Sequence, residues 1–440
     1  MSPTADINMY KGPVGPLSNR CPLCPSRSAR SSRLRRCAGC RAFSYCSREH
    51  QVAHRPQHKS ACTKIKKARA KLDREEHDVR NATENEWTPA NAFETHAGRF
   101  WGILSTRDYM RARYALARQL LYLGTLDSVG EGLEHLRDML RLCRSDNMGV
   151  RNIVPATMLR LDLDQECYDF IKWWAEGKPE DGQYDWGDTT LPYLNFRGGE
   201  VLEDPSFLLG HYTELNFLVA LLILKLKLLV DIRNLKVARK VLSQHRLPAE
   251  LQTQIEQNVI RSPLSAKFQK ESYASLVKTE TTLSEHARQI GTNIAQENHD
   301  FMLELFEPEE ALCAAPEVYS YGSWEEIALV MQNSYATWWE TEGVLDLLKD
   351  ARAWVARDSG SGIEACIEQE QFRKGPTAAQ IQNDLCVNRI WGYLEEAVED
   401  ASYLGPWSGR PTERRAKEIR EMCRREETES DDKASSDNED

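Results

Sequence analysis

Eight cysteine and histidine side chains near the start of the chain have the spacing of metal ligands. They form four pairs, which are Cys21 and Cys24, Cys37 and Cys40, Cys46 and His50, and His58 and Cys62. Cysteines separated by two residues hold a tetrahedral ion from a tight turn, and ligands four positions apart share one helix face. Eight such ligands fill two tetrahedral sites and leave no position for water. The pattern therefore predicts two structural zinc ions rather than a catalytic one.

Disulfides are the alternative explanation for cysteines so close together. Residues 1–20 are polar and contain three prolines, so they do not resemble a secretory signal. We therefore expect an intracellular chain, in the nucleus, the cytoplasm or both, whose thiols stay reduced. The segment also has few bulky apolar residues and needs an ion to fold. Zinc is the favoured interpretation.

The residues around the ligands resemble the MYND zinc finger. The similarity lies in Cys-Pro-Leu-Cys at 21–24, Arg-Cys-Ala-Gly-Cys at 36–40, Ser-Tyr-Cys-Ser-Arg-Glu-His-Gln at 44–51 and His-Lys-Ser-Ala-Cys at 58–62. Spacing alone leaves the grouping of the ligands open, but the resemblance implies an interleaved one. One ion would be held by Cys21, Cys24, Cys46 and His50, and the other by Cys37, Cys40, His58 and Cys62.

The elements that position these ligands are expected to be short. A helix is predicted to start after Ser47, which is a suitable N-cap, and a second one near Pro56, because proline is tolerated in a first helical turn. His54 lies four residues from both His50 and His58, but eight ligands already fill two sites. We predict that His54 supports the ligands or lies at the surface.

The resemblance also implies a shallow groove for short proline-rich peptides, with Ser44, Gln51 and Arg55 as candidate partner-binding residues. The family usually has tryptophan where this chain has Arg55. The loss of an aromatic anchor argues against a Pro-x-Leu-x-Pro ligand and favours recognition by charge. The alternative is a finger that only supports the rest of the protein.

Charge is unevenly distributed along the chain. The total is −10, of which residues 1–70 carry +13 and the other 370 residues −23. This asymmetry predicts an acidic protein partner, a nucleic-acid contact, or docking of the finger onto its own acidic body. Aromatic residues are not interleaved with the basic runs at 27–36 and 64–71, so we expect no specific nucleic-acid recognition.

The rest of the chain is predicted to be all-α. The expected organisation is a flexible N-terminus at 1–20, the finger at 21–62, a basic helical linker at 63–90, a helical domain at 91–407 and a charged, disordered tail at 408–440. Apolar positions predict helices over 109–123, 128–143, 155–161 and 164–175, and a third helix–turn–helix over 229–239. This resembles a degenerate tetratricopeptide-like array and the body of a group of fungal MYND proteins without assigned activity. An irregular helical domain is the alternative.

Two further segments have distinctive compositions. The apolar run 217–230 contains Lys225 and Lys227, which indicates a buried core helix and not a membrane span. The tract at 181–202 is rich in glycine, aromatic and acidic residues. It is predicted to be a long ordered loop that covers the core or binds a ligand.

Sequence motifs give no support for catalysis. Only 20 residues precede Cys21, too few for the first part of a split SET methyltransferase domain, and no Asn-His-Ser-Cys-like segment follows. Phosphate-binding loops, zinc-protease motifs and nucleophile elbows are also absent from the sequence. We predict a non-catalytic adaptor that recruits partner proteins into transcriptional or other regulatory complexes, with proline-rich or acidic peptides as the candidate ligands. The alternatives are a divergent methyltransferase and a nucleic-acid-associated zinc protein.

Overall fold

The computed structural model describes residues 17–24, 34–84, 88–177, 184–210, 213–305, 308–316 and 318–344. The predicted tail at 408–440, the last part of the helical domain at 345–407 and most of the predicted flexible N-terminus lie outside the described residues. The described chain is mostly helical, which confirms the predicted all-α body with a small N-terminal finger.

Thirteen α-helices and one two-stranded sheet are present in these residues. Their bounds are β1 Arg35–Arg36, β2 Ser44–Tyr45, α1 Arg48–Ala53, α2 Arg55–Arg80, α3 Ala92–Thr95, α4 Arg107–Leu123, α5 Leu126–Leu142, α6 Val154–Arg160, α7 Asp164–Glu176, α8 Leu215–Leu242, α9 Ala249–Val259, α10 Tyr273–Glu297, α11 Phe301–Glu304, α12 Glu309–Cys313 and α13 Trp324–Glu340.

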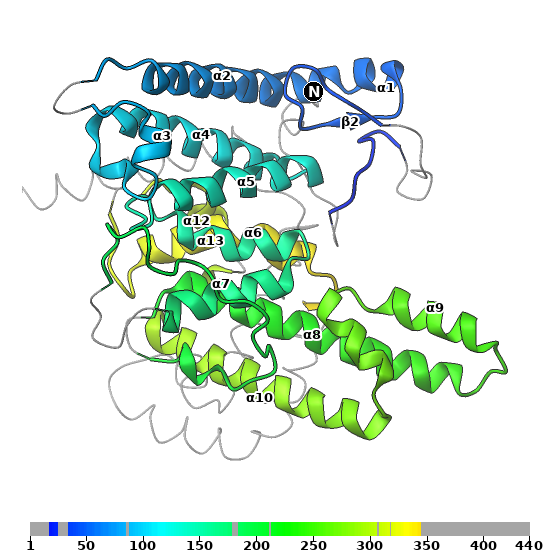
Figure 1. Cartoon of the computed structure of the whole chain (residues 1–440). Helices are drawn as coiled ribbons and strands as arrows, with labels where there is room; N and C mark the ends of the chain where they lie inside the picture. Colours follow the sequence, from blue (N-terminus) through cyan, green and yellow to red (C-terminus); the bar gives the residue numbers. More distant parts are fainter. Residues whose placement is uncertain are drawn as a thin grey trace, which may run out of the picture.

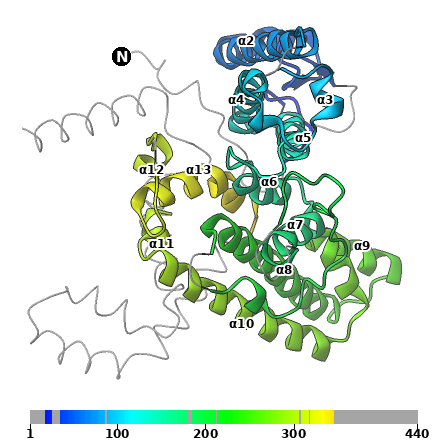
Figure 2. The ribbon, with the colours of Figure 1, turned by 60° about the vertical axis from the view of Figure 1, so that its left-hand side comes forward.

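The helices form a stack with the finger at one end. Helices α2, α4, α5, α6, α7, α8 and α10 follow one another from top to bottom in Figure 1. Helix α13, although late in the sequence, packs against the earlier helices α6 and α8, as Figure 2 shows from another side. None of the helices in the described ranges is long and apolar enough to cross a membrane.

Helix α2 joins the finger to the stack without a break. It begins at Arg55, next to the predicted start, and continues past residue 62 to Arg80. Its buried residues Ile65, Leu72 and Val79 recur every seven positions, so they share the face that packs on α4. Residues 63–80, expected as a linker, are therefore a packed layer of the stack.

The first two predicted helix pairs are present as α4–α5 and α6–α7. Gly124 ends α4 with a positive φ of 72°, and Thr125 and Ser128 form a capping box that starts α5. The third predicted pair is wrong, because α8 runs through the expected turn at 229–239 as one helix. Asp231 explains the difference: it is buried and accepts hydrogen bonds from the backbone N–H groups of Arg261 (2.9 Å) and Ser262 (2.8 Å).

Helix α8 lies at the centre of the core. Every residue from Phe217 to Ile232 is buried, including the two lysines. The ammonium group of Lys225 donates to backbone carbonyls, among them that of Glu203 at 3.1 Å, and that of Lys227 pairs with Asp162 (2.5 Å) and Asp164 (2.8 Å). The apolar run is thus a core helix, as its composition predicts, and its charges are compensated inside the protein.

Candidate metal centre

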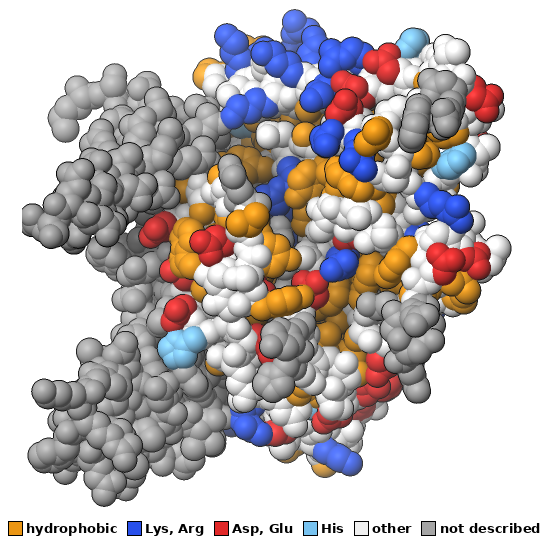
Figure 3. Space-filling view, turned by 90° about the vertical axis from the view of Figure 1, so that its left-hand side faces the viewer, with side chains coloured by type: hydrophobic (Ala, Val, Ile, Leu, Met, Phe, Trp, Pro, Cys, Tyr) orange, Lys and Arg blue, Asp and Glu red, His pale blue; other side chains and the backbone are white. Residues whose placement is uncertain are grey.

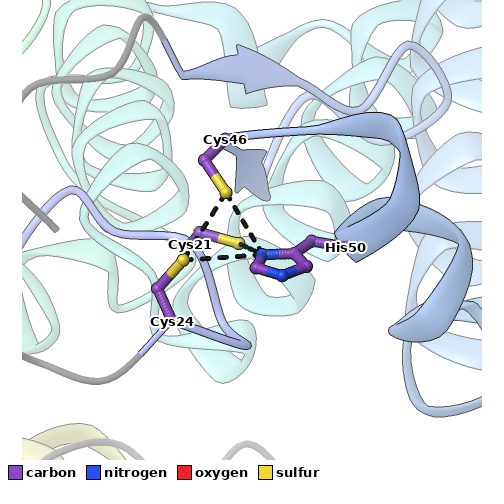
Figure 4. A group of neighbouring side chains, drawn as sticks. All are labelled: Cys21, Cys24, Cys46 and His50. Atoms are coloured by element: carbon purple, nitrogen blue, oxygen red, sulfur yellow. Dashed lines mark hydrogen bonds between the residues drawn. The ribbon is translucent and has the colours of Figure 1, made fainter. Parts of the chain in front are cut away.

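The first ligand group joins the N-terminal turn to the start of α1. A backbone hydrogen bond from Cys24 to Cys21 (3.1 Å) closes the turn, Cys46 follows β2, and His50 projects from α1. The Ser47 hydroxyl caps α1 as predicted, because it accepts from the His50 N–H at 3.3 Å. Figure 4 shows the four side chains pointing toward one another.

The second group joins the β1–β2 turn to α2. Cys37 and Cys40 lie in that turn, and His58 and Cys62 lie one helical turn apart on α2. All four ligands are buried. Gly39 is required at this position, because a Cβ atom here would lie 2.9 Å from the Sγ of Cys62. The spacing of the ligands does not predict this requirement.

The distances within both groups suit tetrahedral zinc. Bonds of about 2.3 Å to sulfur and about 2.0–2.1 Å to nitrogen place neighbouring ligand atoms about 3.5–3.8 Å apart. In the first group, Sγ of Cys24 lies 3.5 Å from Sγ of Cys46, and Sγ of Cys21 lies 3.4 Å from Nδ1 of His50. In the second group, Sγ of Cys37 and Sγ of Cys62 are 3.9 Å apart. Each group therefore supplies four donors that fit one ion, in the interleaved order that the resemblance implies.

Tyr45 holds the imidazole of His58 in place. The Nε2 atom of His58 faces Cys40 Sγ at 3.2 Å, so it is the ligand atom, and the proton is then carried by Nδ1. That N–H donates to the Tyr45 hydroxyl oxygen (2.9 Å), and the hydroxyl in turn donates to Nδ1 of His54 (3.0 Å). Burial lowers the pKa of His58 to about 4, which keeps the ring neutral and available to a metal at pH 7.

His54 belongs to neither ligand group. Its ring lies edge-on to Phe43 with centroids 5.1 Å apart, and it supports His58 through Tyr45. This is one of the two roles predicted from the sequence. The contribution of Tyr45 was not anticipated, although a tyrosine directly before a cysteine ligand was the signal that could have indicated it.

The finger is fixed to the helical stack at the beginning of α5. Both carboxylate oxygens of Asp127 are used: one accepts from Arg36 at 2.6 Å and the other from the Ser44 hydroxyl at 2.8 Å. On α2, Arg69 donates both to Glu131 (2.7 Å) and to the backbone carbonyl of Cys40 (2.9 Å). A basic finger is therefore docked on acidic residues of its own body, which is one of the three explanations that its charge allowed.

Because of this docking, the three candidate partner-binding residues differ in their accessibility. Ser44 is buried, and its hydroxyl is bound to Asp127. Gln51 is half-buried on α1, and Arg55 is exposed at the start of α2. A peptide that needed the hydroxyl of Ser44 would have to displace Asp127, whereas Arg55 is accessible from solvent.

Comparison with known proteins identifies the finger. Residues 20–62 match the model of the MYND finger family. Neither the curated proteins nor the solved structures that were searched contain a match to this chain. The MYND finger is a zinc-binding protein-interaction domain, and both ligand groups of this chain are of the Cys3His type. The prediction of two structural zinc ions is thereby confirmed.

Proposed function

Starting from a MYND finger docked on its own helical stack, we propose that this protein is a non-catalytic adaptor. It binds partner proteins through the outer face of α1 and the first turn of α2. The observation that carries the proposal is that the described residues of α1 include none that is buried, although the first ligand group holds this helix through His50 and through Cys46 just before it. A short helix held rigidly with its side chains in solvent is suited to recognition.

The chemistry of this face indicates the kind of partner. Arg48 and Val52 are exposed one turn apart on α1, and the exposed Arg55 begins α2 three residues after Val52. Val52 is 63% exposed, so its apolar side chain is accessible to a partner. An apolar side chain flanked by two arginines suits an acidic peptide that carries one apolar anchor.

The coordination of zinc supports binding rather than catalysis. When four protein donors complete each tetrahedron, the ion has no position for a substrate or an activated water. When bound, the ions supply the cross-links that keep α1, the β1–β2 hairpin and α2 together. We therefore assign them a structural role and propose that the protein is not an enzyme.

The proposal is tested with purified, zinc-loaded full-length protein and fluorescent peptides. An acidic peptide with one leucine is compared with a proline-rich peptide of the Pro-x-Leu-x-Pro type by anisotropy. We expect saturable binding of the acidic peptide, and at least about tenfold weaker binding by Arg55→Glu, because a paired charge becomes a repulsive one. The matched control is Arg74→Glu, which makes the same charge change on the exposed far half of α2.

Two results would contradict the proposed face. One is equal loss of affinity in Arg74→Glu, which would indicate general charge attraction. The other is preferential binding of the proline-rich peptide that survives Arg55→Glu and is lost in Ser44→Ala, which would place recognition at the β2 strand. Co-purification from cells with the wild type, Arg55→Glu and Cys37→Ala then identifies the partners. Saturable binding of S-adenosylmethionine in calorimetry would contradict the non-catalytic assignment.

A further inference from the structure

A pocket lined by five arginines lies at the opposite end of α5 from the finger. Its volume is about 650 Å³, within the range of about 300–1,000 Å³ that is typical of small-molecule sites. The arginines are Arg99, Arg137, Arg141, Arg144 and Arg197. Asp127, which docks the finger, precedes Arg141 by 14 residues on the same helix, so the two sites are separated by about 21 Å. Figure 3 shows the side of the molecule at which α5 ends.

Three separate segments build this arginine pocket. The backbone at 98–99 pairs with the chain after α5: Gly98 N–H donates to the carbonyl of Leu142 (2.9 Å), and Arg144 N–H donates to that of Gly98 (3.0 Å). This pairing brings Arg99 and Arg144 together. The third segment, residues 184–197, closes over Gly98, which has a φ of 97° and whose absent Cβ would lie 2.9 Å from Thr189.

The third segment is itself firmly held. Tyr193 packs edge-on against Trp173 of α7, with ring centroids 5.0 Å apart, and the Tyr184 hydroxyl donates to the carbonyl of Pro192 at 2.7 Å. The tract predicted either to cover the core or to bind a ligand therefore covers the core with its aromatic side chains. The same tract supplies Arg197 to the pocket.

Three of the five guanidinium groups form no ion pair with a carboxylate in the described part of the chain. Arg99 donates to the carbonyl of Gly187 (2.5 Å), Arg144 to those of Asp188 (3.3 Å) and Leu191 (3.1 Å), and Arg197 to that of Leu194 (2.7 Å). A carbonyl oxygen orients a guanidinium but does not neutralise it. Arg144 also lies over the ring of Tyr193, 5.1 Å from its centroid.

The nearby carboxylates offset only part of the positive charge. Arg137 pairs with Glu134 and Glu166, and Arg141 pairs with Asp138 at 2.5 Å. The carboxylate of Asp188 accepts from the N–H and hydroxyl of Thr190, and the charges of Arg99 and Arg144 also contribute to the lowering of its pKa, although neither forms an ion pair with it. Exposed Glu94 is the one acidic residue in the lining. Like charges held this close repel one another unless an anion lies between them.

We propose that the arginine pocket binds a compact ligand that carries two or more phosphate groups. The planar guanidinium group donates two parallel hydrogen bonds to a phosphate, and backbone carbonyls already hold Arg99, Arg144 and Arg197 in place. Little side-chain entropy is therefore lost on binding. The site does not include the finger, so this proposal can be tested independently of the adaptor function.

The test is calorimetric titration of the zinc-loaded full-length protein with inorganic tripolyphosphate. We expect saturable one-to-one binding, weakened about tenfold or more in Arg144→Gln because a charge-assisted contact is lost. Arg141→Gln is the second variant, because Arg141 lines the pocket but pairs only along its own helix. A smaller loss of about threefold is expected there, since Asp138 already offsets part of its charge. Thermal unfolding verifies that each variant is folded.

Arg111→Gln is a closely matched control. Arg111 and Arg141 are both 55% exposed, and each pairs with an aspartate three positions before it on its helix. Unchanged affinity in Arg111→Gln, together with the losses above, supports the site. Absence of saturable binding, or equal losses in Arg111→Gln and Arg141→Gln, overturns it. A doubly phosphorylated peptide and its unphosphorylated form are then titrated: binding of the phosphopeptide that depends on Arg144 assigns the phosphates to a protein, and binding of tripolyphosphate alone assigns them to a free metabolite.

Discussion

The buried side chains of the finger are mainly its metal ligands, whereas helix α8 buries every residue from Phe217 to Ile232. Apart from the ligands, the finger hides little more than Ala42, Phe43 and Tyr45. Its order therefore depends on the ions, and the order of the stack depends on apolar contacts. The two regions are joined through α2 and through Asp127, so a change in one can be measured while the other serves as an internal reference.

Loss of zinc is expected to give the largest difference in stability between the finger and the helical stack. Structural zinc supplies about 10–16 kcal/mol of apparent binding energy in small fingers. We expect Cys37→Ala to empty the second site and unfold the finger, while α4 to α8 stay helical. Zinc content and hydrogen exchange over residues 34–62 measure this directly.

The matched variant is Cys167→Ala, which alters a buried cysteine of α7 that is not a ligand. It should retain two zinc ions and lower the free energy of unfolding of the stack by about 1 kcal/mol. If Cys37→Ala unfolded the stack as completely as the finger, the two regions would be one cooperative unit.

The next largest effect is expected inside α8. Replacing Lys227 with Ala leaves the carboxylate of Asp164 buried without its cation. Breaking a buried pair in this way costs about 3–5 kcal/mol. Urea unfolding should show this loss with zinc content unchanged, and Lys240→Ala, at an exposed position of the same helix, should have little effect. Equal stability of the two variants would contradict the role assigned to Lys227.

Tyr45→Phe tests how the finger holds its second ion. The change removes the hydroxyl that fixes His58 and leaves the ring in place. Loss of such a supporting hydrogen bond weakens metal affinity by about 10–100-fold. Competition with a chromogenic chelator measures the affinity, and Tyr273→Phe, 54% exposed on α10, is the control. Unaltered affinity in Tyr45→Phe would show that the α2 backbone alone orients His58.

The smallest effect concerns the contact between the two regions. Burial, the largest single influence, raises the pKa of the Glu131 carboxyl, but the hydrogen bonds and charges of Arg69 and His135 together outweigh burial and lower that pKa to about 2. Because this folded-state pKa is below the unfolded value of 4.5, the contribution of Glu131 to stability is complete above pH 4.5. It is lost as the pH falls from 4.5 toward 2.

Glu131→Gln should therefore be less stable than the wild type at pH 7, by about 1 kcal/mol or less, because the pair is only partly buried. The difference should shrink as the pH falls through this window. Acid also releases zinc, but it does so in both proteins, so the difference between their free energies of unfolding isolates Glu131. A difference independent of pH would contradict the ion pair with Arg69.

Some parts of the fold follow from local patterns. Ser47 caps α1, Pro56 lies in the first turn of α2, and Gly124 ends α4 with a positive φ, as their sequence positions indicate. The turn predicted within 229–239 is absent, and the polar residue Asp231 of this segment is instead buried within α8. Its partners, Arg261 and Ser262, are about 30 positions away along the chain, and no local pattern can reveal them.

The sequence by itself determined the two zinc sites and the helical class of the body. A ligand pair two or four positions apart, or an apolar stripe with helical period, depends only on backbone geometry over a few residues. Only the tertiary structure decided that Ser44 faces Asp127 and that Arg99, Arg144 and Arg197 meet at one pocket. These arrangements depend on contacts between distant segments, whose free energy is fixed by packing of the whole stack and not by any one stretch of residues.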